Sequence, residues 1–343
     1  MKLSHSTAAA AALLTFVAGD VSAQTPRANG ETLNIQQYAG TTGNMQATIA
    51  KEKGFCAKYN FTCALKIINS GSLGLQTLVG KSIDVALTGT DLTASTINAG
   101  ADLVIVGTSI KSTVLILTAR SDVPLPNKPK GYPAVMADFK GLKIGVPARG
   151  SAAEVYMNVM LRDAGLQASD VTYVGVGGPA TAYTAMAVGK QVDAVIVFEP
   201  IKALCNHTKN CTVVVDLTLG EGPRLMREMS SAGIPMIMRR DFVEANPALM
   251  AAFYAAMTDA AAWMHDPANF DDVVKIYTPL INFGDIGGGE ELRRSWLKTA
   301  IPTYSRDLSV DRKAVKATID FGVEAKTLDR PVEVSRIVWG KAP

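Results

Sequence analysis

The chain has 343 residues, of which 48% are hydrophobic and 19% are charged, and its 34 Lys and Arg nearly balance its 31 Asp and Glu. This length suffices for two domains with buried cores. The near-neutral charge and the lack of a basic, aromatic-studded patch argue against nucleic-acid binding. Three His residues are too few for a His-rich metal site, and we expect neither a metal nor a cofactor.

The N-terminal segment 1–23 has the pattern of a cleavable secretory signal peptide. Lys2 precedes an apolar run from Ala8 to Ala18, and Val21-Ser-Ala23 supplies small residues for cleavage before Gln24. The run is shorter than the ~20 residues that span a bilayer, and no Cys follows the cleavage site to carry a lipid anchor. We therefore expect a soluble, exported mature protein.

Export changes how the four Cys residues are interpreted. Cys56 and Cys63 flank one short turn, and Cys205 and Cys211 flank another. In an oxidising compartment, such close pairs predict two local disulfides. The alternative is a zinc site with four Cys ligands, but neither pair has C-x-x-C spacing.

The first half of the chain alternates predicted strands and helices. Strands are expected at 33–38, 64–69, 83–87, 104–107 and 114–118, all in one sheet. Helices follow the turn segments 39–44, 70–72 and 88–91, and Thr90 or Asp91 can cap the last of them.

The second half begins after a Pro-rich connector at 121–140. A strand at 142–146 and a turn at 147–150 lead into a helix with Ser151 as its N-cap. Further strands are expected at 171–176, 194–198, 213–216 and 234–238, and the pattern is helical from residue 241 onward. We interpret the Met and aromatic residues between Met250 and Met264 as a core stripe.

The same unit occurs twice, at an offset of 109 residues that carries Leu33 to Leu142. Leu33-Asn-Ile35 and Tyr38-Ala-Gly-Thr-Thr42 align with Leu142-Lys-Ile144 and Pro147-Ala-Arg-Gly-Ser151, and segment 80–87 aligns with 189–196. Two domain-sized copies predict two α/β lobes that face each other across a cleft. Asp84 and Asp193 also correspond, and we interpret both as structural.

The order of the motifs resembles that in periplasmic substrate-binding proteins of ABC importers, in the nitrate/sulfonate/taurine group. The matching segments are AKEKGF (50–55), GKSIDVALTGT (80–90), FKGLKIGVPARGS (139–151), LRDAGLQASDV (161–171) and GKQVDAVIVFEP (189–200). The resemblance implies the α/β, two-lobed type II periplasmic-binding-protein fold with a ligand cleft between the lobes. It places lobe 1 at 31–119 plus 236–343 and lobe 2 at 120–235, with chain crossings near 119–121 and 233–236.

The resemblance and the repeat point to the same loops as the ligand site. Ser and Thr at helix starts, with free backbone N–H groups beside them, favour an anion. The glycines can instead serve only tight turns, the hydroxyls can be simple caps, and Arg149 can point to solvent. The expected ligand-binding residues are Tyr38, Thr41, Thr42, Gly43, Asn44, Thr88, Gly89, Thr90, Arg149, Gly150, Ser151, Gly178, Phe198 and Glu199.

The resemblance implies a monomeric periplasmic protein that delivers a small organic anion, such as a sulfonate, a taurine-like compound or a carboxylate, to ABC permease and ATPase subunits. Glu199 would repel an anion unless it pairs with Arg149 or with an amino group on the ligand. A neutral pyrimidine- or flavin-like ligand between Tyr38 and Phe198 is an alternative, and so is a sensor subunit. An enzyme similar to thiamine-pyrimidine synthases is another, but their Cys-rich motif and active-site His have no counterpart here, and we expect no catalysis.

Overall fold

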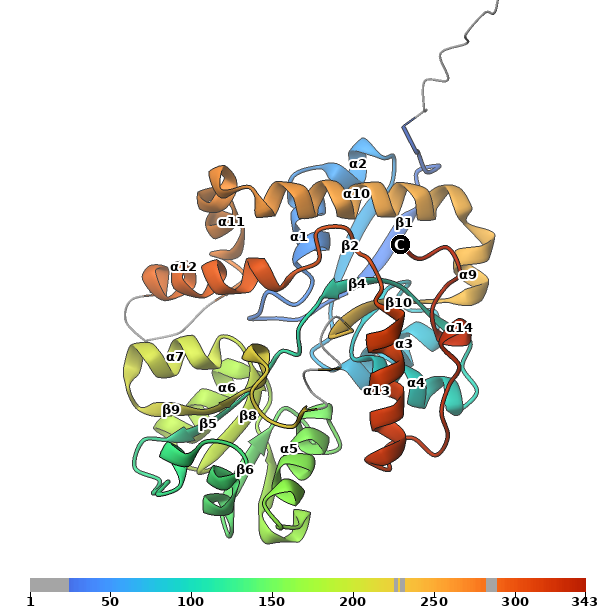
Figure 1. Cartoon of the computed structure of the whole chain (residues 1–343). Helices are drawn as coiled ribbons and strands as arrows, with labels where there is room; N and C mark the ends of the chain where they lie inside the picture. The colour runs from blue at the N-terminus through green and yellow to red at the C-terminus, as the bar shows by residue number, and fades with distance from the viewer. Residues whose placement is uncertain (1–24, 225–227, 229–231, 282–288) are drawn as a thin grey trace, which may run out of the picture.

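The computed structural model describes residues 25–224, 228, 232–281 and 289–343, so the predicted signal peptide at 1–23 lies outside the described residues. The protein has two α/β lobes, the lower one in Figure 1 carrying strands β5 to β9. We call this part lobe 2, and we call the part that carries β1 to β4 and β10 lobe 1. The predicted fold class is confirmed.

Lobe 1 contains two small groups of strands. β1 (Thr32–Gln37) pairs in parallel with β2 (Thr62–Ile67), and an isolated bridge joins Ile35 to Val85, next to β3 (Ala86–Leu87). β10 (Ile234–Arg239) lies antiparallel between β3 and β4 (Leu103–Ile110). A strand that comes late in the sequence therefore completes the sheet of lobe 1.

Lobe 2 has one five-stranded sheet in the order β7-β6-β8-β5-β9. Its strands are β5 (Leu115–Arg120), β6 (Lys143–Val146), β7 (Thr172–Gly175), β8 (Ala194–Phe198) and β9 (Cys211–Asp216). The strand expected at 114–118 in the first sheet is β5, which instead lies antiparallel between β8 and β9. An apolar run predicts a buried strand but not the sheet that it joins, which explains the error. The lobe boundaries given above stay a prediction.

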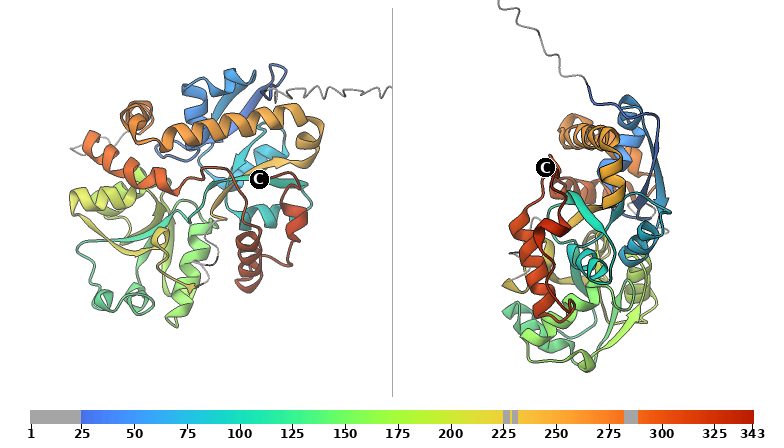
Figure 2. Two further views of the ribbon diagram at one scale, coloured as in Figure 1. Left: turned by 45° about the horizontal axis from the view of Figure 1, so that its top comes forward. Right: turned by 90° about the vertical axis from the view of Figure 1, so that its right-hand side faces the viewer.

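Helices cover the sheets, and the longest lies along lobe 1 in both views of Figure 2. This is α10, whose Met250, Phe253, Met257 and Met264 are buried against α1, α2 and their neighbours, so the predicted core stripe is confirmed. The helices are α1 (Met45–Glu52), α2 (Phe55–Lys58), α3 (Gly71–Val79), α4 (Thr90–Asn98), α5 (Ala152–Asp163), α6 (Pro179–Tyr183), α7 (Ile201–Thr208), α9 (Arg240–Ala245), α10 (Pro247–His265), α11 (Phe270–Tyr277), α12 (Gly289–Ala300), α13 (Arg312–Glu324) and α14 (Val334–Ile337).

Both predicted cysteine pairs lie at disulfide distance. The Sγ atoms of Cys56 and Cys63 are 2.07 Å apart and join α2 to β2. Those of Cys205 and Cys211 are 2.00 Å apart and join α7 to β9. Each bond therefore connects neighbouring elements of a single lobe.

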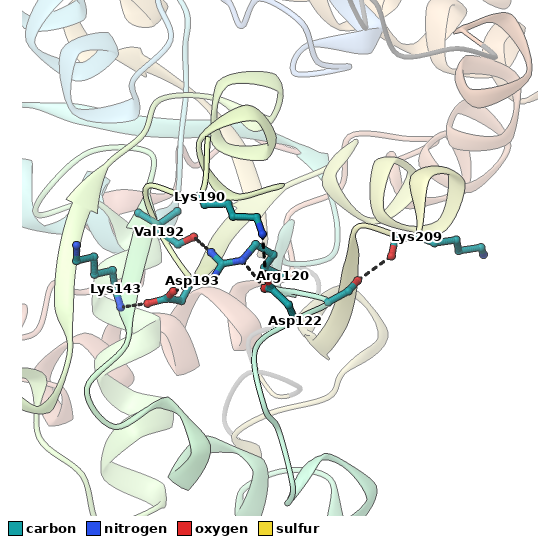
Figure 3. A network of polar contacts seen from close by, with 8 residues as sticks. Arg120, Asp122, Lys143, Lys190, Val192, Asp193 and Lys209 are labelled. Carbon is teal, nitrogen blue, oxygen red and sulfur yellow. Dashed lines mark hydrogen bonds and ion pairs between the residues drawn. The ribbon is translucent and has the colours of Figure 1, made fainter. Parts of the chain in front are cut away.

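A mostly buried arginine at the end of β5 links this strand to the rest of the lobe 2 sheet, as Figure 3 shows. The Arg120 Nη1 donates to the Val192 carbonyl at 2.8 Å, and Nη2 lies 3.2 Å from Oδ1 of Asp193. Oδ2 of Asp193 accepts from the Lys143 backbone N–H at 2.9 Å, which ties β6 into the same contact. Asp122 pairs with both Arg120 and Lys190 at the surface.

Lobe 1 contains a similar arrangement around Arg239, whose partners lie at the predicted offset from those of Arg120. The Arg239 Nη1, at the end of β10, donates to the Ile83 carbonyl at 2.8 Å, and Nη2 lies 3.5 Å from Oδ1 of Asp84. Oδ2 of Asp84 accepts from the Asn34 backbone N–H at 2.9 Å. Asn34, Ile83 and Asp84 correspond to Lys143, Val192 and Asp193 in the repeat, which supports the structural interpretation of both aspartates.

Candidate functional site

A cavity of about 260 Å³ lies between the two lobes. In lobe 1 its wall comes from the loops after β1 and β3 and from the starts of α3 and α4, and in lobe 2 from the start of α5 and the end of β8. Residues of α12 and of the turn after it also contribute. The predicted site residues on this wall are Tyr38, Thr41, Thr42, Gly43, Thr88, Gly89, Thr90, Ser151, Phe198 and Glu199.

The other predicted residues lie off the described wall. The Asn44 amide donates to the Gln36 carbonyl at 3.1 Å inside lobe 1. Arg149 is at the surface, with its side chain 62% exposed and its Nε 2.9 Å from Glu154. The backbone N–H of Gly150 donates to the same carboxylate, and Gly178 precedes α6. The charge of Arg149 is therefore balanced by Glu154 outside the cavity.

The start of α5 presents polar groups to the cavity. Ser151 immediately precedes the helix, and its Oγ is buried without a hydrogen-bond partner among the described residues. Ala152 and Ala153 also line the cavity, and backbone N–H groups in the first turn of a helix have no intrahelical acceptor. This corner can donate several hydrogen bonds to an acidic group.

The start of α1 is already occupied by a tyrosine. The Tyr304 hydroxyl donates to the Thr42 carbonyl at 2.6 Å, and burial raises the pKa of Tyr304, which keeps the hydroxyl neutral. The side chains of Thr42 and Tyr304 both line the cavity. The backbone N–H of Met45, the first residue of α1, also donates to the Tyr304 hydroxyl, so this helix start is less open than that of α5.

Glu199 lies two residues before α7, and its carboxylate accepts hydrogen bonds from the start of that helix. Its Oε2 accepts from the Lys202 backbone N–H at 2.9 Å, and its Oε1 lies 3.7 Å from Nζ of Lys202. That Nζ also contacts Asp216 at 2.8 Å. Burial raises the pKa of Glu199, and the charge of Lys202 offsets part of the rise. Lys202, the cationic side chain on the described wall, is thus held between two carboxylates.

Two aromatic rings from opposite lobes meet across the cavity. Tyr38 and Phe198 lie edge to face, with ring centroids 6.5 Å apart and planes at 74°. The Tyr38 hydroxyl donates to the Leu87 carbonyl at 2.6 Å, which fixes the ring against lobe 1. An apolar part of a ligand would lie against this pair.

Sequence reasoning missed Asp91, Tyr156 and Trp296 as cavity-lining residues. Oδ1 of Asp91 and Nε1 of Trp296 are both buried without a hydrogen-bond partner among the described residues. The sequence indicates Asp91 only as a possible helix cap. Its position directly after Thr90, an expected ligand-binding residue, was the signal that could have identified it. Trp296 comes from α12, far from the other residues in sequence, and no pattern could have connected it to them.

In the described residues, no group of three or more His, Cys, Asp and Glu side chains is arranged to hold a metal ion. None of the helices there combines the length and the apolar character needed to cross a membrane.

The model of the NMT1-like family matches residues 32–278. No curated protein matches the sequence. Among solved structures, one from Bordetella bronchiseptica RB50 is 24% identical, covers 91% of this chain and 95% of that chain, and has a TM-score of 0.72.

Two further structures are named for their ligands. The alkanesulfonate-binding protein SsuA from Xanthomonas axonopodis pv. citri, bound to MOPS, is 19% identical, with coverage of 90% and 98% and a TM-score of 0.69. The periplasmic aliphatic sulphonate binding protein SsuA from Escherichia coli is 21% identical, with coverage of 92% and 99% and a TM-score of 0.68. At these identities the likeness establishes the fold, that of the periplasmic binding proteins.

Proposed function

The chain belongs to the NMT1-like family, and from this we propose that it is an exported solute-binding protein that captures a small organic acid between its lobes. The solute is then passed to the permease and ATPase of an ABC importer. The observation that carries the proposal is the cavity between the lobes. On its wall, at the start of α5, lies the Ser151 hydroxyl, which has no hydrogen-bond partner in the described part of the chain. The names of the two SsuA structures support a sulfonate or a related acid.

The acidic group of the solute lies at the start of α5. Ser151 and the first-turn N–H groups there are hydrogen-bond donors, and a helix N-terminus stabilises an anion by roughly 0.3–1 kcal/mol, more when it is buried. The start of α4 is less suitable for an anion, because the Asp91 carboxyl group lies in the first turn of that helix. Hydrogen bonds from these donors gain most from an ionised acceptor.

The cavity suits a small solute. Its volume is about 260 Å³. An apolar body of the solute contacts Tyr38 and Phe198. Since these two rings belong to different lobes, a bound solute holds the lobes together.

A ligand screen tests the proposal. The protein is unfolded and refolded to remove bound material, then titrated calorimetrically with alkanesulfonates, carboxylates and neutral heterocycles. We expect acids to bind, and Ser151→Ala to weaken them roughly five- to tenfold through the loss of a hydrogen bond to a charged group. Ser95→Ala, on the exposed face of α4, is the matched control.

Two results would count against the proposal. Tight binding of a neutral heterocycle that Ser151→Ala leaves unchanged would contradict an acidic solute. Conversion of a bound compound to a new product, followed by mass spectrometry, would indicate an enzyme instead of a binding protein.

A further inference from the structure

The charges on the cavity wall do not balance. Its ionisable acidic and basic side chains, among the described residues, are Asp91, Glu199 and Lys202. Lys202 contacts Glu199 and Asp216, so its positive charge is already shared by two carboxylates. Asp91 has no cationic partner in the described part of the chain, which leaves the wall with an excess of negative charge on the side of α4.

Asp91 is fixed in position and almost fully buried. It is the second residue of α4 and is 8% exposed. A Cβ added at Gly89 would meet Oδ1 of Asp91, so the carboxyl group packs directly over this glycine. Oδ1 has no hydrogen-bond partner in the described residues.

The cost of burying the charged form of the Asp91 carboxyl group is offset only in part by other groups of the chain. Burial raises the pKa of Asp91, and the backbone N–H groups of Leu92 and Asp91 offset part of the rise. The pKa of Tyr156, on α5 in lobe 2, is raised mainly by the burial of this tyrosine and also by the charge of Asp91. The Asp91 carboxyl group in lobe 1 therefore lies near α5. A buried carboxylate without a cationic partner is costly, and a ligand that supplies a proton donor removes that cost.

We propose that Asp91 is a specificity-determining residue that binds a protonated amino group of the solute. This rests on the proposed function, because it concerns a second group on the same ligand. The ammonium donates to the Asp91 carboxylate, while Ser151 and Trp296, which line the same cavity, supply donors for the acceptor groups of the solute. A second anionic group at Asp91 is rejected by charge repulsion.

Matched pairs of compounds test this proposal on the refolded full chain. Each amine is compared calorimetrically with the analogue in which a methyl group replaces the ammonium. The pairs are 3-aminopropane-1-sulfonate with butane-1-sulfonate, 4-aminobutanoate with pentanoate, and 4-(aminomethyl)benzoate with 4-ethylbenzoate. We expect the amine of at least one pair to bind roughly tenfold more tightly than its analogue, the range of a charge-assisted hydrogen bond.

Asp91→Asn removes the charge with little change of shape and should bring that ratio close to one. Asp102→Asn, at an exposed aspartate that pairs with Arg240, is the matched control and should leave the ratio unchanged. Circular dichroism checks that each variant folds, and the wild-type ratio is informative even if Asp91→Asn does not.

The outcomes separate the two proposals. If the methyl analogues bind as tightly as the amines, or if Asp91→Asn leaves the ratio unchanged, the role of Asp91 is wrong while the binding of organic acids stands. If no member of any pair binds, the proposed function fails for these acids, and the role of Asp91 fails with it.

Discussion

Replacing Arg120 by Met should destabilise lobe 2 by disconnecting β5 from its sheet. The Arg120 side chain is 15% exposed, and it contacts the Val192 carbonyl, Asp193 and Asp122. Met keeps the aliphatic stem, so the loss comes from the guanidinium group and not from the packing of the chain.

The magnitude follows from the three contacts. A hydrogen bond from a charged group contributes about 1.5–3 kcal/mol, and this applies to the bond to Val192. The pair with Asp193 is discounted because that side chain is 27% exposed, and the pair with the exposed Asp122 contributes about 0–1 kcal/mol. We expect a loss of about 2–3 kcal/mol in the free energy of unfolding.

Urea denaturation, with hydrogen exchange to locate the change, measures this loss. Exchange should increase in β5 and β8 but not in β1 and β2. Lys190→Met, which removes a 63% exposed partner of Asp122, is the control and should stay within about 0.5 kcal/mol of wild type. Arg239→Met should reproduce the effect in lobe 1, because Arg239 makes the corresponding contacts there.

The reasoning would be refuted by an Arg120→Met variant as stable as the Lys190→Met control. A loss in Arg120→Met with increased exchange spread evenly over both lobes would also contradict it, since the contacts lie within one sheet.

Three other predictions concern the cysteines, the pH dependence and the movement of the lobes. Unreduced peptides should show Cys56–Cys63 and Cys205–Cys211 bonds by mass spectrometry, and loss of either bond should cost about 2–3 kcal/mol of stability; free thiols or bonds between the pairs would contradict this. The folded pKa of Asp91 lies above its ordinary value of 3.8. The ligand-free wild type should therefore lose stability relative to Asp91→Asn as the pH rises from about 4 through that folded pKa. Melting temperatures of the two proteins measure this, and a difference that does not change with pH would contradict it. Saturation with ligand should reduce the radius of gyration in solution scattering as the lobes close, and an unchanged radius would count against closure.

Much of the fold could be predicted because its signals are local or repeated. β8 was expected at its observed bounds, and β1 and β2 within two residues of theirs. The offset that relates Asp84 to Asp193 indicated two lobes of one construction. The residues that Arg120 and Arg239 contact follow the same offset, although the two arginines themselves do not. The assignment of β5 failed because strand exchange between sheets depends on tertiary pairing, which the period of an apolar run does not encode.

The candidate site was predictable where residues follow strands, and less so elsewhere. Ser151 could be placed on the cavity wall from the repeat, and Phe198 from the family resemblance. Arg149 could not be placed, because its direction depends on Glu154 one helical turn away. Trp296 and Tyr304 line the cavity because the C-terminal segment packs against it. That packing depends on tertiary contacts, which no local sequence pattern indicates.

The position of β5 bears on how the chain can be divided. β5 lies between β8 and β9, yet it precedes the long connector that separates the two halves of the sequence. A fragment that began at residue 121 would lack this strand, so β8 would gain an unpaired edge and β9 would lose the one strand with which it pairs. Such edges pair readily with other chains, so a fragment cut there would aggregate, whereas one that began before Leu115 would retain the sheet.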